Sequence, residues 1–304
     1  MIKFDVVGFG ALNLDMLLKV NRLAGAEEES VIEDYTEACG GSAANTIVGL
    51  ARLGCKVGFI GKVANDREGK LQIDCFNTEG VDTSGIIQAK QGKSGSVLGF
   101  VDKKGARALY INSGVNDTIE SREINREYVS QTKFLHLSSF VGEKSIRAQK
   151  KLLATLPGDV KISFDPGSVY AQKGFAVIEP IIRSSYVLMP NAVELEQLTG
   201  EPDYGKGADF MIEMGVKIVA VKLGSKGCYV TDGQERLRID PFPVKVVDTT
   251  GAGDAFCAGF LYGLIHGKSL YECGYLGNFV ASRSVMKMGA RAGLPYVKDL
   301  ELLG

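Results

Sequence analysis

Short runs of β-branched and other apolar residues recur along the chain and alternate with longer stretches that have the periodicity of amphipathic helices. The longer stretches predict helices at residues 42–53, 144–156 and 192–199. Strands that are separated by helices of this size form βαβ units, so the pattern predicts an α/β fold with a mostly parallel central sheet. The predicted strands of that sheet are 4–7, 57–60, 134–137, 160–164, 186–189, 218–221 and 229–231.

Four further strand-like segments do not fit this alternation, at residues 12–20, 31–38, 94–102 and 106–111. The last two flank the sequence Asp102-Lys103-Lys104-Gly105, which is typical of a β-hairpin turn. Such strands can form a small separate sheet that covers a cleft, or they can extend one edge of the main sheet. We expect the separate sheet, a lid formed by segments at about 12–38 and 94–112.

The carboxy-terminal third has a helical pattern at about 251–266 and 270–288, and a strand-like segment, 244–247, precedes it. Between them lies the sequence D-T-T-G-A-G-D-A-F at 248–256. Its small residues leave consecutive N–H groups free at the positive end of a helix, which is an anion site without a cationic side chain. Asp254 could there accept a proton from a hydroxyl that attacks a bound phosphorus. Taken alone, the segment fits equally well a glycine-rich helix cap with a favourably placed aspartate.

Composition and charge exclude several classes of partner. The net charge is −1 and the isoelectric point is about 6.2, so no basic field is available for nucleic acid or an anionic membrane. Six scattered cysteines without a C-x-x-C pair, and only two histidines, argue against a structural zinc site. The amino terminus begins a strand without a signal peptide, and no apolar run has the length of a membrane span. We therefore expect a soluble cytoplasmic protein.

Two familiar nucleotide-binding motifs are incomplete in this chain. The sequence G-F-G at 8–10 follows the first strand, but Asn13 replaces the third glycine of a dinucleotide-binding fingerprint. The G-K-S triplets at 92–94 and 267–269 both lack the leading glycine of a P-loop. An oxidoreductase with a Rossmann site and a P-loop enzyme are therefore not expected.

Four segments, in order along the chain, resemble the signatures of the ribokinase (phosphofructokinase B) family of carbohydrate and nucleoside kinases. They are G-G-S-A-A-N at 40–45, running on to Leu53-Gly54, N-A-V-E at 191–194, K-L-G-S-K-G at 222–227, and the segment 248–256. The resemblance extends over essentially the whole chain. It implies one catalytic domain, 1–304, with the family's three-layer sandwich and small β-sheet lid. It also implies Mg²⁺-dependent transfer of the terminal phosphoryl group of ATP to a hydroxyl of a small sugar or nucleoside.

The resemblance also implies roles for individual residues. Asp254 is expected to be the catalytic base, with an anion hole formed by the N–H groups of Gly251, Ala252 and Gly253. Residues expected to bind the substrate are Asn13, Asp15, Gly40, Gly41, Ser42 and Asn45. Those expected near the nucleotide are Asn191, Lys222, Ser225, Gly227 and Asn278, although Lys222 could be only a charge at a strand end.

Two cation sites follow from the same resemblance. Asn191 and Glu194 are expected to orient Mg²⁺ through water, and their spacing also fits a helix-capping pair, a compatible reading. Asp248 and the carbonyl of Thr250 match the family's monovalent-cation site, so K⁺ is expected to activate.

The choice of substrate remains open in the sequence. Ribokinases proper carry a lysine where this chain has Ser42, which weakens ribose as the substrate and is closer to the nucleoside kinases. ATP is the expected donor. The alternatives are an ADP-dependent enzyme, a kinase for a phosphorylated or acidic sugar, and a non-catalytic protein that binds a sugar or nucleoside. A homodimer that pairs through the lid is also expected from the family.

Overall fold

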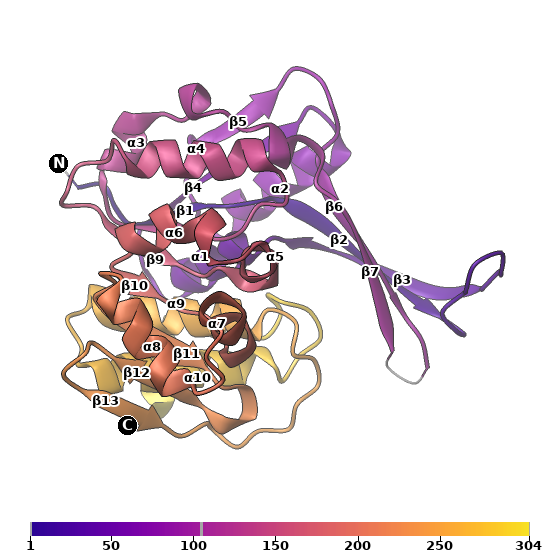
Figure 1. The fold of residues 1–304 in the computed structure, drawn as a ribbon. Coiled ribbons are helices and arrows are strands. Elements are labelled where there is room, and N and C mark those ends of the chain that lie inside the picture. The colour runs from indigo at the N-terminus through magenta and orange to yellow at the C-terminus, as the bar shows by residue number, and fades with distance from the viewer. Residues whose placement is uncertain (1, 104–105, 304) are drawn as a thin grey trace.

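The computed structural model describes residues 2–103 and 106–303, and a nine-stranded sheet is its centre (Figure 1). The strand order is β13-β12-β11-β10-β9-β8-β1-β4-β5. The pairs from β11 to β5 are parallel, and only β12 and β13 at one edge pair antiparallel. The strands are β1 (Phe4–Phe9), β4 (Val57–Ala64), β5 (Ile86–Ala89), β8 (Thr132–Leu137), β9 (Lys161–Phe164), β10 (Val187–Leu188), β11 (Ile218–Lys222), β12 (Cys228–Thr231) and β13 (Arg236–Ile239).

Helices cover both faces of this sheet and give two separate hydrophobic cores. In β1, the neighbours Val6 and Val7 point to opposite faces and enter different cores, as successive residues of a strand must. One face packs on α1 (Ser42–Arg52), α2 (Arg67–Thr78), α9 (Ala252–Ile265) and α10 (Leu270–Ser284). The other packs on α3 (Arg126–Ser130), α4 (Glu143–Leu153), α5 (Gly167–Lys173), α6 (Phe175–Ser184), α7 (Ala192–Thr199) and α8 (Tyr204–Glu213).

A second, four-stranded sheet projects from the body of the protein (Figure 1). Its order is β3-β2-β6-β7, with β2 (Asn13–Val20), β3 (Ile32–Gly40), β6 (Gly95–Val101) and β7 (Arg107–Asn112). The central pair, β2 and β6, is parallel, and the outer pairs are antiparallel. The prediction of a separate small sheet is therefore confirmed, and the alternative of extra edge strands is wrong. Lys104 and Gly105 of the predicted hairpin turn lie outside the described residues.

Two sequence predictions in the carboxy-terminal third were wrong, and two neighbouring hydrogen bonds explain them. Residues 244–247 form no strand; instead the N–H of Val247 donates to the carbonyl of Val285 over 2.8 Å. That carbonyl would otherwise accept from the N–H of Gly289 in a continuing helix. The N–H of Gly289 instead donates to the Asp248 carboxylate over 2.8 Å. Helix α10 therefore ends at Ser284 and not near residue 288.

Several elements were absent from the prediction, among them α2, β5 and β13. β5 and β13 are four-residue strands at the two edges of the sheet. Short edge strands carry little pattern to detect. None of the helices in residues 2–103 and 106–303 combines the length and apolar character that crossing a bilayer requires.

Candidate active site

The amino-terminal end of α9 forms an anion cradle. Gly251 caps the helix with φ 74°, and a Cβ there would lie 2.6 Å from the Cβ of Ala290, so only glycine fits. In the described structure, no acceptor meets the N–H groups of Gly251, Gly253 and Asp254, whereas Ala252 donates to the carbonyl of Thr249 over 3.2 Å. Free N–H groups at the positive end of a 14-residue helix attract a negatively charged group.

The carboxylate of Asp254 lies beside this cradle and is held by α1. The Ser42 hydroxyl donates to one of its oxygens over 2.7 Å, and the Asn45 amide donates to the other over 2.9 Å. Thr46 also donates to the backbone carbonyl of Asp254 over 3.1 Å. Burial raises the pKa of Asp254 to about 6, while the hydrogen bonds from Asn45 and Ser42 act in the opposite direction. A carboxylate with this pKa is largely ionised at neutral pH and can accept a proton.

A buried ion pair completes the charged part of the site. The ammonium group of Lys222, at the end of β11, lies 2.5 Å from the carboxylate of Asp165, and both side chains are almost fully buried. Burial alone would lower the pKa of Lys222, but Asp165, Cys257 and Glu194 together more than offset it, and the pKa is raised. A Cβ on Gly253 would lie 3.2 Å from the Lys222 nitrogen, so this cation borders the anion cradle.

Asn191 and Glu194 form the reciprocal capping pair that their spacing allows. Glu194 N–H donates to the Asn191 side chain over 2.9 Å, and Asn191 N–H donates to the Glu194 carboxylate over 2.8 Å. Burial, followed by the negative charge of Asp165, raises the pKa of Glu194. A buried carboxylate beside a second one is a favourable position for a cation. Within the described residues, no three His, Cys, Asp or Glu side chains cluster as direct metal ligands.

Glycines and acidic side chains meet where the second sheet joins the body. Gly41 has φ 107°, and a Cβ there would lie 2.2 Å from the carbonyl oxygen of Ala11. A Cβ on Gly40 would overlap the carboxylate of Asp15, which therefore packs directly on this glycine. Burial raises the pKa of Asp15 to about 7, although the positive charge of Arg291 partly opposes this.

Asn13 lies one step along the same strand face and is held from the body of the protein. The side chain of Asn116 donates to the Asn13 side-chain oxygen over 2.9 Å and to the carbonyl of Leu12 over 2.9 Å. The Leu12 N–H donates back to the Asn116 side chain over 2.9 Å. The predicted substrate residues on β2, β3 and α1 therefore form one neighbourhood with Asp254.

The predicted nucleotide residues divide into two groups. Asn191 and Lys222 form a parallel bridge with each other, and the other three lie around the end of β13. Gly227 has φ 81°, and a Cβ there would lie 2.1 Å from the carbonyl oxygen of Ile239. The Asn278 amide, on α10, donates to the carbonyls of Ile239 and Asp240 over 3.2 and 3.0 Å. Ser225 lies in the single turn of η3 (Gly224–Lys226) that leads to Gly227. The turn at Gly227, the end of β13 and α10 thus meet at one place.

Asp248 and Thr250 form a compact turn before the cradle. The N–H and hydroxyl of Thr250 donate to one Asp248 oxygen over 3.0 and 2.7 Å. The other Asp248 oxygen accepts from Gly289, as described above. These bonds hold the carbonyls of the turn in fixed positions next to the loop that follows α10.

Three residues of the site were missed by the sequence analysis: Asp165, Asn116 and Arg291. Asp165 had a detectable signal, because it directly follows the predicted strand 160–164, and polar residues at the carboxyl ends of parallel strands commonly serve a site. Asn116 lies in the short 3₁₀ helix η1 (Gly114–Thr118) and Arg291 in the loop after α10, and nothing in their local sequence marks them.

Comparison with known proteins identifies the family. Residues 3–296 match the model of the pfkB family of carbohydrate kinases. The chain belongs to this family. It is therefore a sugar or nucleoside kinase in class, and the resemblance of its four motifs is confirmed over nearly the whole length.

Individual pfkB relatives agree with this placement. The chain is 46% identical over 255 residues to an uncharacterized sugar kinase of Archaeoglobus fulgidus, covering 83% of this chain and 100% of that protein. It is 31% identical over 322 residues to a 5-dehydro-2-deoxygluconokinase of Clostridium botulinum, covering 98% and 92%. The crystal structure of a ribokinase from Thermotoga maritima superimposes with a TM-score of 0.88 at 28% identity, covering 98% of both chains. The predicted ribokinase-like sandwich is confirmed.

Proposed function

We propose that this protein transfers the terminal phosphoryl group of ATP to a hydroxyl of a small sugar or nucleoside, with Asp254 as the catalytic base. The observation that carries the proposal is the position of the Asp254 carboxylate, in the first turn of α9 and directly beside free N–H groups. The Asp254 carboxylate therefore accepts a proton, and the neighbouring N–H groups stabilise the charge of the phosphoryl group that is transferred.

Each part of the site has a distinct task in this reaction. Asp15 and Asn13 offer acceptors and donors that suit the hydroxyls of a polyol, and the Asp15 carboxylate has no hydrogen-bond donor among the described residues. The acceptor hydroxyl loses its proton to Asp254 as it attacks. The cradle N–H groups and the Lys222 ammonium group then offset the negative charge on the transferred group.

Magnesium fits the acidic cluster at the start of α7. Glu194 is buried next to Asp165, and a divalent cation with its water shell would relieve this repulsion. When bound, the ion would neutralise phosphate charge. We expect Glu194→Gln to raise the Mg²⁺ concentration needed for half-maximal rate at least about tenfold. An unchanged Mg²⁺ dependence would remove Glu194 from this role.

The substrate is proposed only as a class. Named relatives include an ATP-dependent ribose-1-phosphate kinase of Halopiger xanaduensis, at 33% identity over 256 residues, and an Arabidopsis thaliana ribokinase in complex with ribose and ATP, at 26% identity and a TM-score of 0.86. In this chain position 42 is a neutral serine, whose hydroxyl donates a hydrogen bond to Asp254, so this position offers no cation to an acidic substrate.

A coupled kinase assay tests the proposal. ATP and ADP should each be offered with pentoses, hexoses, keto-acid sugars, inositol, nucleosides and ribose 1-phosphate, and the Asp254→Asn variant is the control. We expect ATP-dependent phosphorylation of a neutral sugar or nucleoside that the variant has lost. Binding of a sugar or nucleoside without any phosphorylation would replace the proposal with a non-catalytic binding protein.

A monovalent cation near Asp248 is a second part of the proposal. The hydrogen bonds of Asp248 and Thr250 fix the turn that carries the Thr250 carbonyl next to the cradle. We expect K⁺ to raise kcat over Na⁺ at equal ionic strength. Equal rates in the two salts would refute this site.

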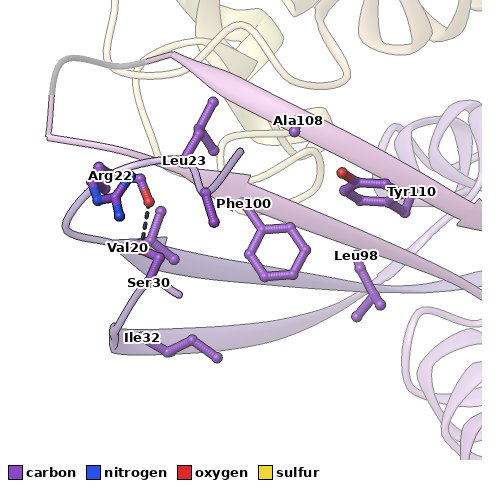
Figure 2. A pocket seen from close by; sticks show the side chains of 10 residues that line it. Val20, Arg22, Leu23, Ser30, Ile32, Leu98, Phe100, Ala108 and Tyr110 are labelled. Carbon is purple, nitrogen blue, oxygen red and sulfur yellow. Dashed lines mark hydrogen bonds between the residues drawn. The ribbon is translucent and has the colours of Figure 1, made fainter. Parts of the chain in front are cut away.

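The second sheet is proposed as a lid and as the surface that forms a homodimer. One hollow in it has a volume of about 500 Å³ and is lined mainly by apolar side chains, among them Leu98, Phe100 and Tyr110 (Figure 2). Ile32 and Tyr110 are exposed by 50% and 62%, although large apolar side chains are normally covered. A second copy that closes over this face would cover them. We expect a dimer by sedimentation, and a monomer for Tyr110→Asp; a monomeric parent would refute the proposal.

A further inference from the structure

Arg291 lies in the loop after α10, outside the sequence motifs, yet it reaches the centre of the site. Its Nε donates to the Asn45 side-chain oxygen over 2.8 Å, and its Nη2 lies 3.4 Å from the carbonyl of Gly40. Burial lowers the pKa of Arg291, but a guanidinium group remains charged in proteins at any ordinary pH. Arg291 therefore acts on Asn45 only as a hydrogen-bond donor.

Asn45 stands between two groups of opposite character. On one side is the guanidinium group of Arg291, which only donates, and on the other is the carboxylate of Asp254, which only accepts when ionised. A side-chain amide has one accepting end and one donating end of nearly equal size. Only one orientation satisfies both neighbours, with the oxygen toward Arg291 and the nitrogen toward Asp254.

We propose that Arg291 is a positioning residue that fixes the orientation of the Asn45 amide, so that its nitrogen and not its oxygen faces Asp254. Without Arg291, only the negative charge of Asp254 opposes the reversed amide, and this opposition ends whenever Asp254 takes up a proton. The reversed amide places an oxygen against the carboxylate, and the two repel each other. Asp254 would then lose a hydrogen bond and its fixed direction toward the acceptor hydroxyl. This inference rests on the proposed function for its effect on rate, but the orientation itself is a property of the protein alone.

Other groups also face Asp254 and must remain unsubstituted in any test. Asp165 and Lys222 act from the loop after β9 and from the end of β11, and Ser42 donates from α1. The remaining titratable groups that interact with it are Asp15, Glu194 and Cys257. None of these accepts a hydrogen bond from the Arg291 guanidinium group in the described structure. Asp15 does interact with its positive charge, which Arg291→Met removes and Arg291→Lys retains.

The loop that carries Arg291 has its own anchor, which offers a matched control. Arg52 donates to the carbonyls of Arg291 and Leu294 over 2.6 and 3.2 Å and pairs with Glu79. Arg52→Met should therefore loosen the same loop without touching Asn45. If Arg291 acted only by holding the loop, Arg52→Met would reproduce every effect of Arg291→Met.

The first test is a cycle of variants measured at saturating substrate. Arg291→Met should lower kcat about tenfold with a KM change under about twofold, as expected for one hydrogen bond to a charged group. Arg291→Lys, which retains a donor, should recover part of the loss. In the Asn45→Ala background, Arg291→Met should cost nothing further. Multiplicative losses, or an equal loss of kcat in Arg52→Met, would overturn the proposal.

Two further readouts separate orientation from a general loss of structure. The acidic limb of the kcat profile should move to higher pH by about one unit in Arg291→Met, since a carboxylate that loses a donor gains a proton more readily. The ¹H–¹⁵N signals of the Asn45 side-chain amide, assigned through Asn45→Ala, should change in Arg291→Met and persist in Arg52→Met. Unchanged amide signals in a folded Arg291→Met protein would overturn the proposal.

The spectroscopic readout needs no turnover, so the two proposals can fail separately. A parent protein that phosphorylates none of the offered acceptors would refute the proposed function, and the amide signals would still decide the role of Arg291.

Discussion

The ion pair between Lys222 and Asp165 is predicted to serve both stability and catalysis, and two substitutions can separate these contributions. Lys222→Met removes the cation and leaves the Asp165 carboxylate without it. The Asp165 side chain is only 5% exposed. That carboxylate also lies within interaction range of Asp254 and Glu194, both buried and acidic. Breaking a buried pair from one side costs about 3–5 kcal/mol, since an uncompensated charge is left behind. We expect Lys222→Met to lower the free energy of unfolding by an amount in the upper part of that range.

The second substitution removes the uncompensated charge. In Lys222→Met/Asp165→Asn, no buried ion remains at this position, and the free energy of unfolding should return to within about 1 kcal/mol of the parent. The rate should not return, because the cation that borders the cradle at Gly253 is absent in both variants. We expect kcat to stay at least about 100-fold below the parent, the typical cost of losing one electrostatic contact to the transferred group.

The stability of these variants can be measured by circular dichroism. It contains no tryptophan, so unfolding is best followed by far-ultraviolet circular dichroism during heating and in urea. A loss of about 4 kcal/mol corresponds to a fall of roughly 6 °C in the midpoint for a protein of this size. The reasoning is refuted if Lys222→Met changes stability by less than about 1 kcal/mol. It is equally refuted if the double variant regains the parent's rate.

Three further predictions concern the base and its surroundings. Asp254→Asn should lower kcat by about 10²–10⁴ while nucleotide affinity, measured by calorimetry, changes less than about threefold; near-normal turnover would contradict the assignment. The pKa of Asp254 is raised to about 6 and the ionised form is the active one, so kcat should be constant above pH 7 and fall about tenfold per unit well below pH 6. A profile that stays flat to pH 5 would contradict it. Gly41→Ala combines φ 107° with a Cβ 2.2 Å from a carbonyl oxygen, whereas Gly54→Ala meets only a positive φ, 87°, with nothing within 4 Å. The free energy of unfolding should fall by at least about 2 kcal/mol in Gly41→Ala and by about 1 kcal/mol in Gly54→Ala. Equal midpoints of thermal unfolding in the two variants would show that the close contact carries no cost.

Local pattern sufficed for the main sheet and for the existence of the second one. The detected strands of the main sheet, β1, β4 and β8 to β12, are short apolar runs, and burial on both faces makes such runs conspicuous. The second sheet was detectable because β2 and β3, and again β6 and β7, follow each other without an intervening helix. The edge elements β5 and β13 escaped detection, since a strand with few buried residues has a weak hydrophobic pattern.

The glycine-rich start of α9 could be found from the sequence, because its chemistry resides in consecutive backbone N–H groups. The same holds for the capping pair of Asn191 and Glu194, whose spacing alone brings their atoms together. In both cases the interacting groups lie within one turn of helix. Such local features need no knowledge of the rest of the fold.

The tertiary structure alone decided how Asp254 is held and charged. Its partners Ser42 and Asn45 lie more than 200 positions earlier in the chain, and Arg291 reaches Asn45 from a loop without a motif. The pairing of Lys222 with Asp165 could not be predicted either, because a lysine at the end of a strand is normally expected to be solvated, and only the fold buries this one. The sequence by itself determined the layers, the cradle and the family. The fold decided the protonation and direction of the base, since these depend on burial and on contacts between segments that only packing brings together.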